Sequence, residues 1–375
     1  MEFEATTLLS GLEYLTLGLI TVVSIVLWVR WLGRWKSDKL PLLNSRSRVQ
    51  SPIGLLDVGS MFFLFAIGQV VAVTVCAIGF GLALEDMDTS DPKTLLLVMT
   101  LGSVFQLLTV LLSLGIVMFR YRAGGLAVTS WQSKCIKKDL RIGMYAFLMI
   151  IPIVLLIQVV LTQLIPYEHA TMQLLAQDKR IGTILATWFA AVIVAPVTEE
   201  IFFRGMLQNW LQRVGRQKFW AKNHQVVTVF GGFTHLPEQA DHELKTGMNP
   251  AKNLDPIDPA TTNFENENAS WEKHSEASLS PYASPSPVPM ESADYQPQFV
   301  KEDSALFWLP IVVTSVLFGV VHAGQGPAPI PLFFFSLALG YVYRRTNSIL
   351  PCIALHFFLN AFSMFWFTLG QFVTE

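Results

Sequence analysis

Charged residues are scarce in this chain of 375 residues. Asp, Glu, Lys and Arg make up 14% of it, whereas hydrophobic residues make up 52%, and the mean hydropathy is +0.46. A soluble domain contains about 25% charged residues, and a disordered chain is poor in large apolar residues. The composition therefore predicts an integral membrane protein. The formal net charge of −2 also gives no reason to expect a nucleic-acid partner.

Cysteine is rare as well, and the motifs of several enzyme classes are absent. The three cysteines, Cys76, Cys135 and Cys352, are widely spaced and lie in or beside apolar runs. They indicate neither a disulfide framework nor a CxxC metal site. The chain has no GxSxG nucleophile motif, no HExxH zinc motif and no P-loop. These absences argue against the enzyme classes that use these motifs.

Long apolar runs dominate the rest of the sequence, and a helix needs about 20 such residues to cross a bilayer. The first run is followed, not preceded, by basic residues, which is wrong for a cleaved signal peptide, so we expect it to remain as an anchor. We predict an all-α, polytopic membrane protein of about eight helices around a polar intramembrane cavity. The predicted helices cover residues 12–32, 58–84, 95–119, 142–165, 181–211, 306–322, 330–343 and 349–369.

Basic residues follow the first, third, fifth and seventh of these runs. By the positive-inside rule these loops are cytoplasmic, and both termini lie outside. Since no cleaved targeting segment is recognised, the expected location is a bacterial cytoplasmic membrane, with the endoplasmic reticulum as second choice.

Residues 223–303 differ from the rest, because they contain many prolines, including a Pro-rich run at 281–289, and few apolar residues. We expect a mostly disordered cytoplasmic insert here. It divides the chain into membrane helices at 1–165, a motif-bearing helix with its flanks at 166–222, the insert, and three further helices at 304–375.

A few ionisable residues lie within the apolar runs. Each is costly in a membrane helix, so it is a functional-site candidate by default. Glu200 and Arg204 are four residues apart, share a helix face and can form a charge-assisted pair. Glu199 points about 100° away from this face. Glu199 has no nearby cation in the sequence and is free to exchange a proton, as a general base must.

Two further clusters contain histidine. His322 ends the segment Phe318-Gly-Val-Val-His, and His356 shares a helix face with Asn360, so that these two could donate to an oxyanion. Taken singly, each cluster has a structural interpretation as an ion pair or an interhelical hydrogen bond. Four polar positions on three apolar helices together favour a shared function. The predicted spans, however, put His322 near the outer end of its helix and His356 near the inner start of its own. They meet Glu199 only if the helix that carries His322 is displaced or begins well outside the bilayer.

Zinc is the main chemical alternative. Glu199, His322 and His356 are residue types that bind zinc, but no two histidines are spaced i, i+4 on one helix face. We therefore expect no cofactor, with zinc as the less favoured reading.

The three clusters, in this order, resemble the CAAX protease and bacteriocin-processing (CPBP) family of intramembrane endopeptidases, which is related to the type II CAAX prenyl endopeptidases. That family is marked by EExxxR, FxxxH and HxxxN on successive membrane helices. The resemblance implies that 166–222 and 304–375 form a catalytic domain, which hydrolyses a peptide bond of a membrane-associated protein or peptide. In the eukaryotic branch the substrate is a prenylated CAAX protein.

The resemblance also implies a role for each motif residue. Glu199 and His322 would activate a water, Glu200 with Arg204 would position Glu199, and the last motif would stabilise the oxyanion through His356 and Asn360. The family has been described both as metalloprotease and as glutamate-type protease, and the poor ligand spacing favours the glutamate type here.

Two functions of other classes stay open at this point. A membrane scaffold or bacteriocin-immunity-type protein could bind a peptide in the same cavity without cutting it, and would tolerate Glu199→Gln. A transporter could use Glu199 as a proton carrier, but it would be expected to show an inverted repeat, and the first four helices carry no matching motif.

Overall fold

The structure, a computed structural model, describes residues 2–38, 41–46, 53–79, 91–121, 135–165, 170–215 and 304–373. Every regular element among them is a helix, which confirms the predicted all-α class. The predicted insert at 223–303 lies outside the described residues.

Each of the eight predicted runs coincides with a helix. In chain order the helices are α1 (Glu2–Asp38), α2 (Leu55–Gly79), α3 (Pro92–Tyr121), α5 (Ile136–Leu164), the short α6 (Ala170–Gln177), a continuous helix over residues 181–215, α11 (Ser304–Val320), α12 (Pro329–Thr346) and α13 (Leu350–Val373). Six helices of the described chain are long and apolar enough to cross a membrane, and α11 contains a shorter apolar segment, Phe307–Val320.

The outer surface of these helices is apolar. In α1 only 6% of the most hydrophobic 18-residue window is buried, and the corresponding share is 33% in the helix over 181–215. Helices that leave most of their apolar side chains uncovered, with their backbone groups bonded internally, are suited to lipid and not to water. The chain is therefore an integral membrane protein.

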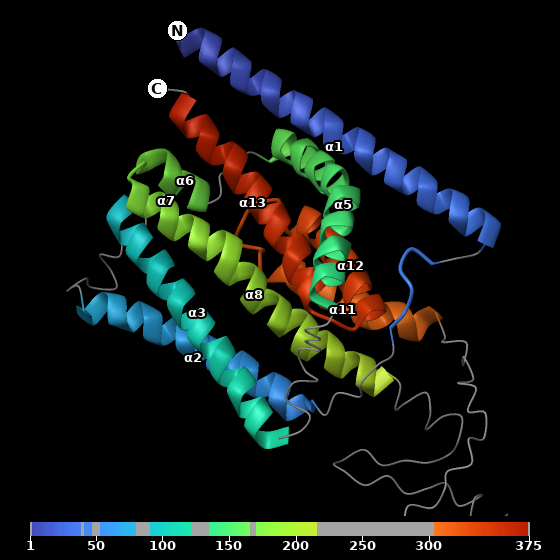
Figure 1. Cartoon of the computed structure of the whole chain (residues 1–375). Coiled ribbons are helices and arrows are strands. Elements are labelled where there is room, and N and C mark those ends of the chain that lie inside the picture. Colours follow the sequence, from blue (N-terminus) through green and yellow to red (C-terminus); the bar gives the residue numbers. More distant parts are fainter. Residues whose placement is uncertain are drawn as a thin grey trace, which may run out of the picture. The chain divides into compact units, whose positions relative to one another are not determined.

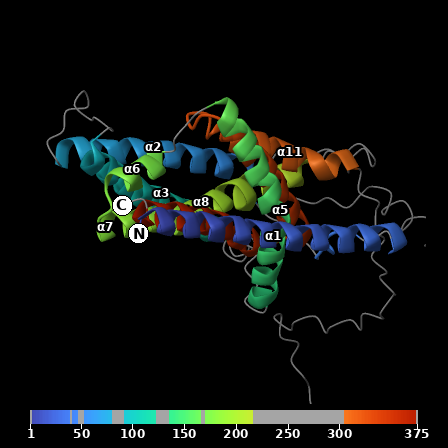
Figure 2. The same ribbon diagram turned by 90° about the horizontal axis from the view of Figure 1, so that it is seen from above.

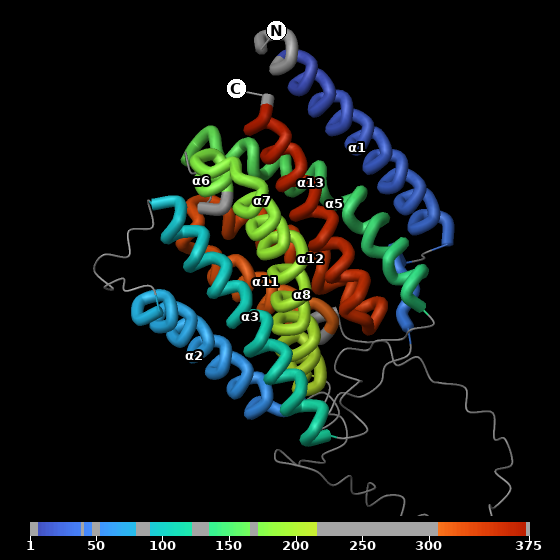
Figure 3. Tube along the Cα trace, turned by 60° about the vertical axis from the view of Figure 1, so that its left-hand side comes forward, coloured from blue at the N-terminus to red at the C-terminus, as the bar shows by residue number. Residues whose placement is uncertain are grey.

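The helix over 181–215, called the central helix below, lies in the middle of the described helices. α2 and α3 lie on one side of it and α13 lies on the other (Figures 1 and 3). α2 packs along α3, α11 packs along α12, and α13 packs on α5. α5 is inclined to α1 and crosses it (Figure 2). There the Met149 carbonyl accepts hydrogen bonds from Ser24 Oγ at 3.1 Å and Trp28 Nε1 at 3.0 Å.

The described ends of the basic loops contact one another. Arg46, after α1, pairs with the buried Asp139 of α5 at 2.5 Å, and its backbone N–H donates to the carbonyl of Arg345 at the end of α12. Arg213, near the end of the 181–215 helix, donates to the Ile53 carbonyl before α2 at 3.0 Å. These segments are the ones that the charge pattern assigns to one side of the membrane. The start of α1 and the end of α13 also lie at one common end (Figure 1).

Candidate active site

The helix that carries the first motif is irregular. It consists of α7 (Ile181–Trp188), the π-helical η3 (Phe189–Val194), α8 (Ala195–Glu200) and the π-helical η4 (Ile201–Gln208), followed by a final α-helical stretch to residue 215. π-helical turns are rare and are frequent at functional sites. Here they flank α8, which ends with the two adjacent glutamates, whereas Arg204 lies within η4.

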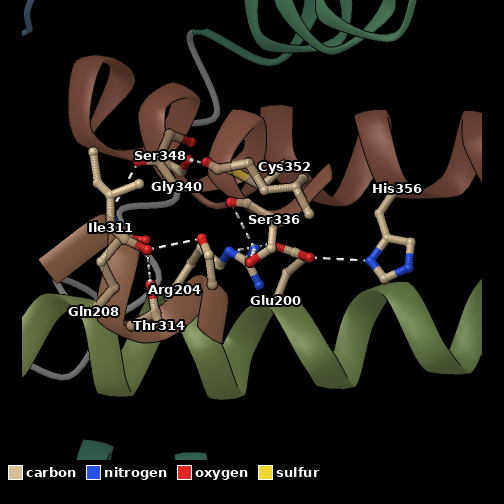
Figure 4. A network of polar contacts seen from close by, with 12 residues as sticks. Glu200, Arg204, Gln208, Ile311, Thr314, Ser336, Gly340, Ser348, Cys352 and His356 are labelled. Atoms are coloured by element: carbon tan, nitrogen blue, oxygen red, sulfur yellow. Dashed lines mark hydrogen bonds and ion pairs between the residues drawn. The ribbon is translucent and has the colours of Figure 1, made fainter. Parts of the chain in front are cut away.

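Glu200 is completely buried in an ionic network (Figure 4). Its Oε2 lies 3.2 Å from Nε of Arg204, and both side chains are 0% exposed. Its Oε1 lies 3.0 Å from Nδ1 of His356 on α13. The predicted pair of Glu200 and Arg204 on one helix face is therefore confirmed. The carboxylate joins the central helix to α13.

The network continues along the same face towards α12. Nη2 of Arg204 donates to Oγ of Ser336 at 2.7 Å and to its carbonyl at 3.2 Å. One turn further on, Gln208 Nε2 donates to the carbonyl of Gly340 at 2.9 Å. A Cβ at Gly340 would lie 2.8 Å from Cγ2 of Ile311 and 3.2 Å from Oε1 of Gln208, so glycine is required for this close approach. The guanidinium of Arg204 also lies over the Phe318 ring, 5.0 Å from its centroid.

The contact with Glu200 sets the tautomer of His356. A carboxylate only accepts hydrogen bonds, so Nδ1 of His356 carries the hydrogen. The ring is held between aromatic neighbours, with its centroid 5.2 Å from that of Phe335 and 6.1 Å from that of Phe318. In the neutral ring, Nε2 is then an acceptor, and it becomes a donor only in the imidazolium form.

Glu199 faces a different environment, a cavity of about 320 Å³. The cavity is lined by residues of α2, α3, the central helix and the turn after α11, namely Phe62, Phe65, Gln106, Val110, Thr198, Glu199, Phe202, Phe203, Val321, His322 and Gln325. The side chain of Glu199 is half-buried, and no hydrogen bond or ion pair joins its carboxylate to any other part of the described chain. Glu199 and His322 are the only residues with ionisable side chains among those that line this cavity.

His322 reaches this cavity because α11 ends early. The helix stops at Val320, and residues 321–328 form a turn that leads directly into α12. Gly319 allows the turn to close, since a Cβ there would lie 2.9 Å from the carbonyl oxygen of Pro329. Nδ1 of His322 lies 2.7 Å from the carbonyl oxygen of Phe318. Because a carbonyl only accepts, Nδ1 carries the hydrogen and the neutral ring keeps its lone pair on Nε2.

Asn360 donates a hydrogen bond to a backbone carbonyl of the central helix that has lost its helical donor. The N–H of Ala195 bonds to Ala190 in the π register, and Pro196 has no N–H to offer. The carbonyl of Ala191 thereby loses its usual helical donor, and Nδ2 of Asn360 donates to it at 2.7 Å instead. One N–H of the Asn360 amide and its oxygen are left for other partners.

The structure thus divides the six predicted residues into two groups and one isolated member. Glu200, Arg204 and His356 form the buried network, and Glu199 and His322 line one cavity. Neither His356 nor Asn360 is among the residues that line that cavity. Although the predicted spans put His322 near the outer end of its helix, His322 and Glu199 line the same cavity.

Several residues of the site carry no sequence motif. Gln106 of α3 donates through Nε2 to Oγ1 of Thr198 at 2.7 Å, one residue before Glu199. Gln208 and Ser336 complete the network around Arg204. The spacing of Glu200, Arg204 and Gln208 at successive intervals of four could have indicated Gln208. Nothing in the sequence singles out Gln106, because its role depends on how α3 packs.

The residue types that could bind a metal do not gather. Among the described residues, no group of three or more His, Cys, Asp or Glu side chains is placed to hold a metal ion. The glutamate-type mechanism therefore stays a prediction.

Fold and site define a class of protein: a polytopic membrane protein whose described elements are all helices, with a buried carboxylate–arginine–histidine network beside a cavity that holds a second glutamate and a second histidine. Residues 181–252 and 295–362 match the family model described as type II CAAX prenyl endopeptidase Rce1-like. This match confirms the resemblance that the three motifs indicated.

The match includes all six predicted residues and does not extend to α1, α2, α3 or α5. Its internal gap, at 253–294, falls within the predicted insert. Searches among curated proteins and among solved structures found no significant match. The family supports an intramembrane endopeptidase of the CAAX type, acting on a membrane-associated protein.

Proposed function

We propose that this protein hydrolyses a peptide bond of a prenylated, CAAX-type protein within the membrane, and that Glu199 and His322 activate the attacking water. The observation that carries the proposal is that these two residues, from motifs more than a hundred residues apart in the sequence, line one cavity. Glu199 has no bonded partner in the described chain that would compete for its proton.

Glu199 and His322 have different roles in the proposed reaction. The Glu199 carboxylate accepts a proton from the water, whose oxygen attacks the scissile carbonyl carbon. Nε2 of His322, the nitrogen that carries the lone pair, accepts a hydrogen bond from the same water and orients it. When the carbon–nitrogen bond breaks, the proton held by Glu199 passes to the leaving amine. No metal is required for these steps.

The buried network supplies the electrostatics next to this cavity. We assign to Glu200 the orientation of His356, because the two are bonded at 3.0 Å. If His356 donates to an oxyanion, as the family resemblance implies, it must do so from Nε2 as an imidazolium, while Nδ1 stays bonded to the Glu200 carboxylate. Arg204 then supplies a positive charge next to the second carboxylate oxygen of Glu200.

Cleavage of a defined substrate tests the proposal. The purified full-length chain is incubated with a farnesylated peptide that ends in a CAAX sequence, and the products are identified by mass spectrometry. We expect loss of the last three residues, and cleavage at least about a hundredfold slower by Glu199→Gln, which keeps the shape but removes the base. Equal cleavage by wild type and Glu199→Gln would contradict the proposal, as would binding without cleavage by the wild type.

The same preparation distinguishes the two kinds of protease. Elemental analysis measures bound zinc in the wild type and in His356→Ala. The glutamate-type mechanism predicts activity without stoichiometric zinc. Stoichiometric zinc that is lost in His356→Ala would instead favour a metalloprotease.

A further inference from the structure

One wall of the cavity comes from helices outside the segments that match the family. Phe62 and Phe65 belong to α2, and Gln106 and Val110 belong to α3, whereas the match begins at residue 181. We propose, on the basis of the proposed function, that this wall selects the substrate. Gln106 hydrogen-bonds the peptide backbone beside the scissile bond, and Phe62 and Phe65 form an apolar subsite.

The hydrogen bonds of Thr198 fix the orientation of Gln106. The hydroxyl of Thr198 donates to the carbonyl of Val194 at 2.8 Å, so that it accepts from Nε2 of Gln106 at 2.7 Å. The amide nitrogen of Gln106 is thus turned to the central helix. Its oxygen and its second N–H have no partner in the described part of the chain, although Gln106 lines the cavity.

This orientation suits a peptide bond. A carboxamide offers one acceptor and one donor side by side, and a peptide backbone presents an N–H and a carbonyl in the same way. In the apolar surroundings of the cavity, a substrate amide without partners would be costly, so Gln106 favours substrates that present a backbone there. Thr198 is adjacent to Glu199, which places this contact next to the catalytic carboxylate.

The aromatic side of the cavity indicates which kind of substrate side chain binds there. The ring centroid of Phe62 lies 4.2 Å from that of Phe202, and that of Phe65 lies 5.9 Å from it. Besides Glu199 and His322, no lining residue carries an ionisable side chain. A negatively charged substrate side chain would be desolvated without a counter-ion and beside the Glu199 carboxylate, whereas an apolar one would replace water favourably.

A structural alternative is that Gln106 only holds α3 against the central helix, as polar side chains do in membrane proteins. Two variants separate the roles. Gln106→Leu removes both the bond to Thr198 and the groups offered to substrate, whereas Thr198→Val removes only the bond. We expect Gln106→Leu to lower kcat/KM about tenfold, mainly through KM, and Thr198→Val to lower it clearly less. Equal losses in the two variants would overturn the assignment of Gln106.

The apolar subsite is tested with farnesylated peptides that differ only in the residue after the prenylated cysteine. Wild type is expected to cleave a leucine peptide at least about tenfold faster than an aspartate peptide, expressed as kcat/KM. The variant Phe62→Ala/Phe65→Ala should shift the ratio of phenylalanine to alanine peptides. Phe63→Ala is the matched control, since Phe63 lies between them on α2 but is 66% exposed and does not line the cavity.

The outcomes also distinguish this inference from the proposed function. If Glu199→Gln cleaves as well as wild type, the proposed function fails. If Glu199→Gln is inactive but the double phenylalanine variant keeps the wild-type ratios, only the inference about the substrate wall fails. Changed ratios in the double variant, and not in Phe63→Ala, support it.

Discussion

Glu199 and Glu200 are neighbours in the chain but have opposite surroundings. Glu200 is fully buried between Arg204 and His356, whereas Glu199 is half-buried at a cavity. Adjacent helix residues point about 100° apart, which separates a carboxylate held by charge from one that can exchange a proton. The pair can therefore divide its work between structure and chemistry.

This division predicts different effects of the same substitution. Glu200→Gln leaves Arg204 buried without a counter-charge, so we expect it to lower the free energy of unfolding by about 3–5 kcal/mol. Glu199→Gln, the matched control, should change the thermal midpoint in detergent very little, because no partner in the described chain is lost. Equal midpoints for the two variants would show that the network does not stabilise the fold.

The pair of Glu200 and Arg204 could be predicted from the sequence, but the contact of Glu200 with His356 could not. An i, i+4 spacing in an apolar helix specifies a local contact, so Glu200 and Arg204 were predictable. His356 lies 156 residues further on, and only the packing of α13 against the central helix brings it to Glu200. Gln106 was hidden for the same reason, since a lone glutamine in an apolar helix has no local signature.

At the level of elements, the central helix depends on a bond from another helix. Pro196 and the π register together deprive the Ala191 carbonyl of its helical donor, and Asn360 supplies one. The α13 side chain therefore holds the helix about two turns before Glu199. Sequence periodicity assumes 3.6 residues per turn throughout, and it could not reveal a change of register.

A double-mutant cycle tests this account. Asn360→Ala should cost about 1 kcal/mol of stability, because it leaves a carbonyl in an apolar setting unpaired. Pro196→Ala restores an N–H in this turn, so Asn360→Ala should cost less in the Pro196→Ala background. The measurement is the thermal midpoint of the four proteins. Strict additivity of the two substitutions would contradict the proposed link between them.

The start of α7 gives a prediction about pH. The Asp178 carboxylate accepts hydrogen bonds from Arg180 and Thr183, which hold its pKa well below the ordinary value, the contact with Arg180 being the largest cause. A lowered pKa in the folded state stabilises the protein above the unfolded pKa of about 3.9, and this contribution is lost as the pH falls through the lower, folded value.

We therefore expect Asp178→Asn to lower the thermal midpoint by a constant amount between about pH 5 and pH 8. The difference from wild type should shrink only below about pH 4. A difference that varied between pH 6 and pH 8 would point to another titrating group. Glu13→Gln on α1, which shows no bond in the described chain, serves as the control.

At the scale of the whole described chain, polar contacts among the loops hold the helices at one end. Asp139 is 1% exposed and binds both Arg46 and Ser348, from three separate parts of the sequence. The positive-inside pattern grouped these loops by side but could not say that they touch. Likewise, apolar runs located the helices, whereas the cavity arises only where α2, α3 and the turn after α11 meet the central helix.

Asp139→Asn should destabilise the protein by roughly 3 kcal/mol, because it leaves Arg46 without its buried counter-ion. Lys138→Gln changes the exposed residue just before Asp139, so it is the control and should have little effect. Thermal unfolding in detergent measures both. A variant of Asp139 as stable as the Lys138 variant would mean that the loops are held by other contacts.

The central claim is that Glu199 and His322 act on one water in one cavity. The most direct test measures kcat on the farnesylated peptide for Glu199→Gln, His322→Gln and the double variant. Residues that act as a unit are not additive, so we predict losses of about 10²–10⁴-fold in each single variant and no further loss in the double variant. Multiplied losses in the double variant, or near-wild-type activity in either single variant, would contradict the account.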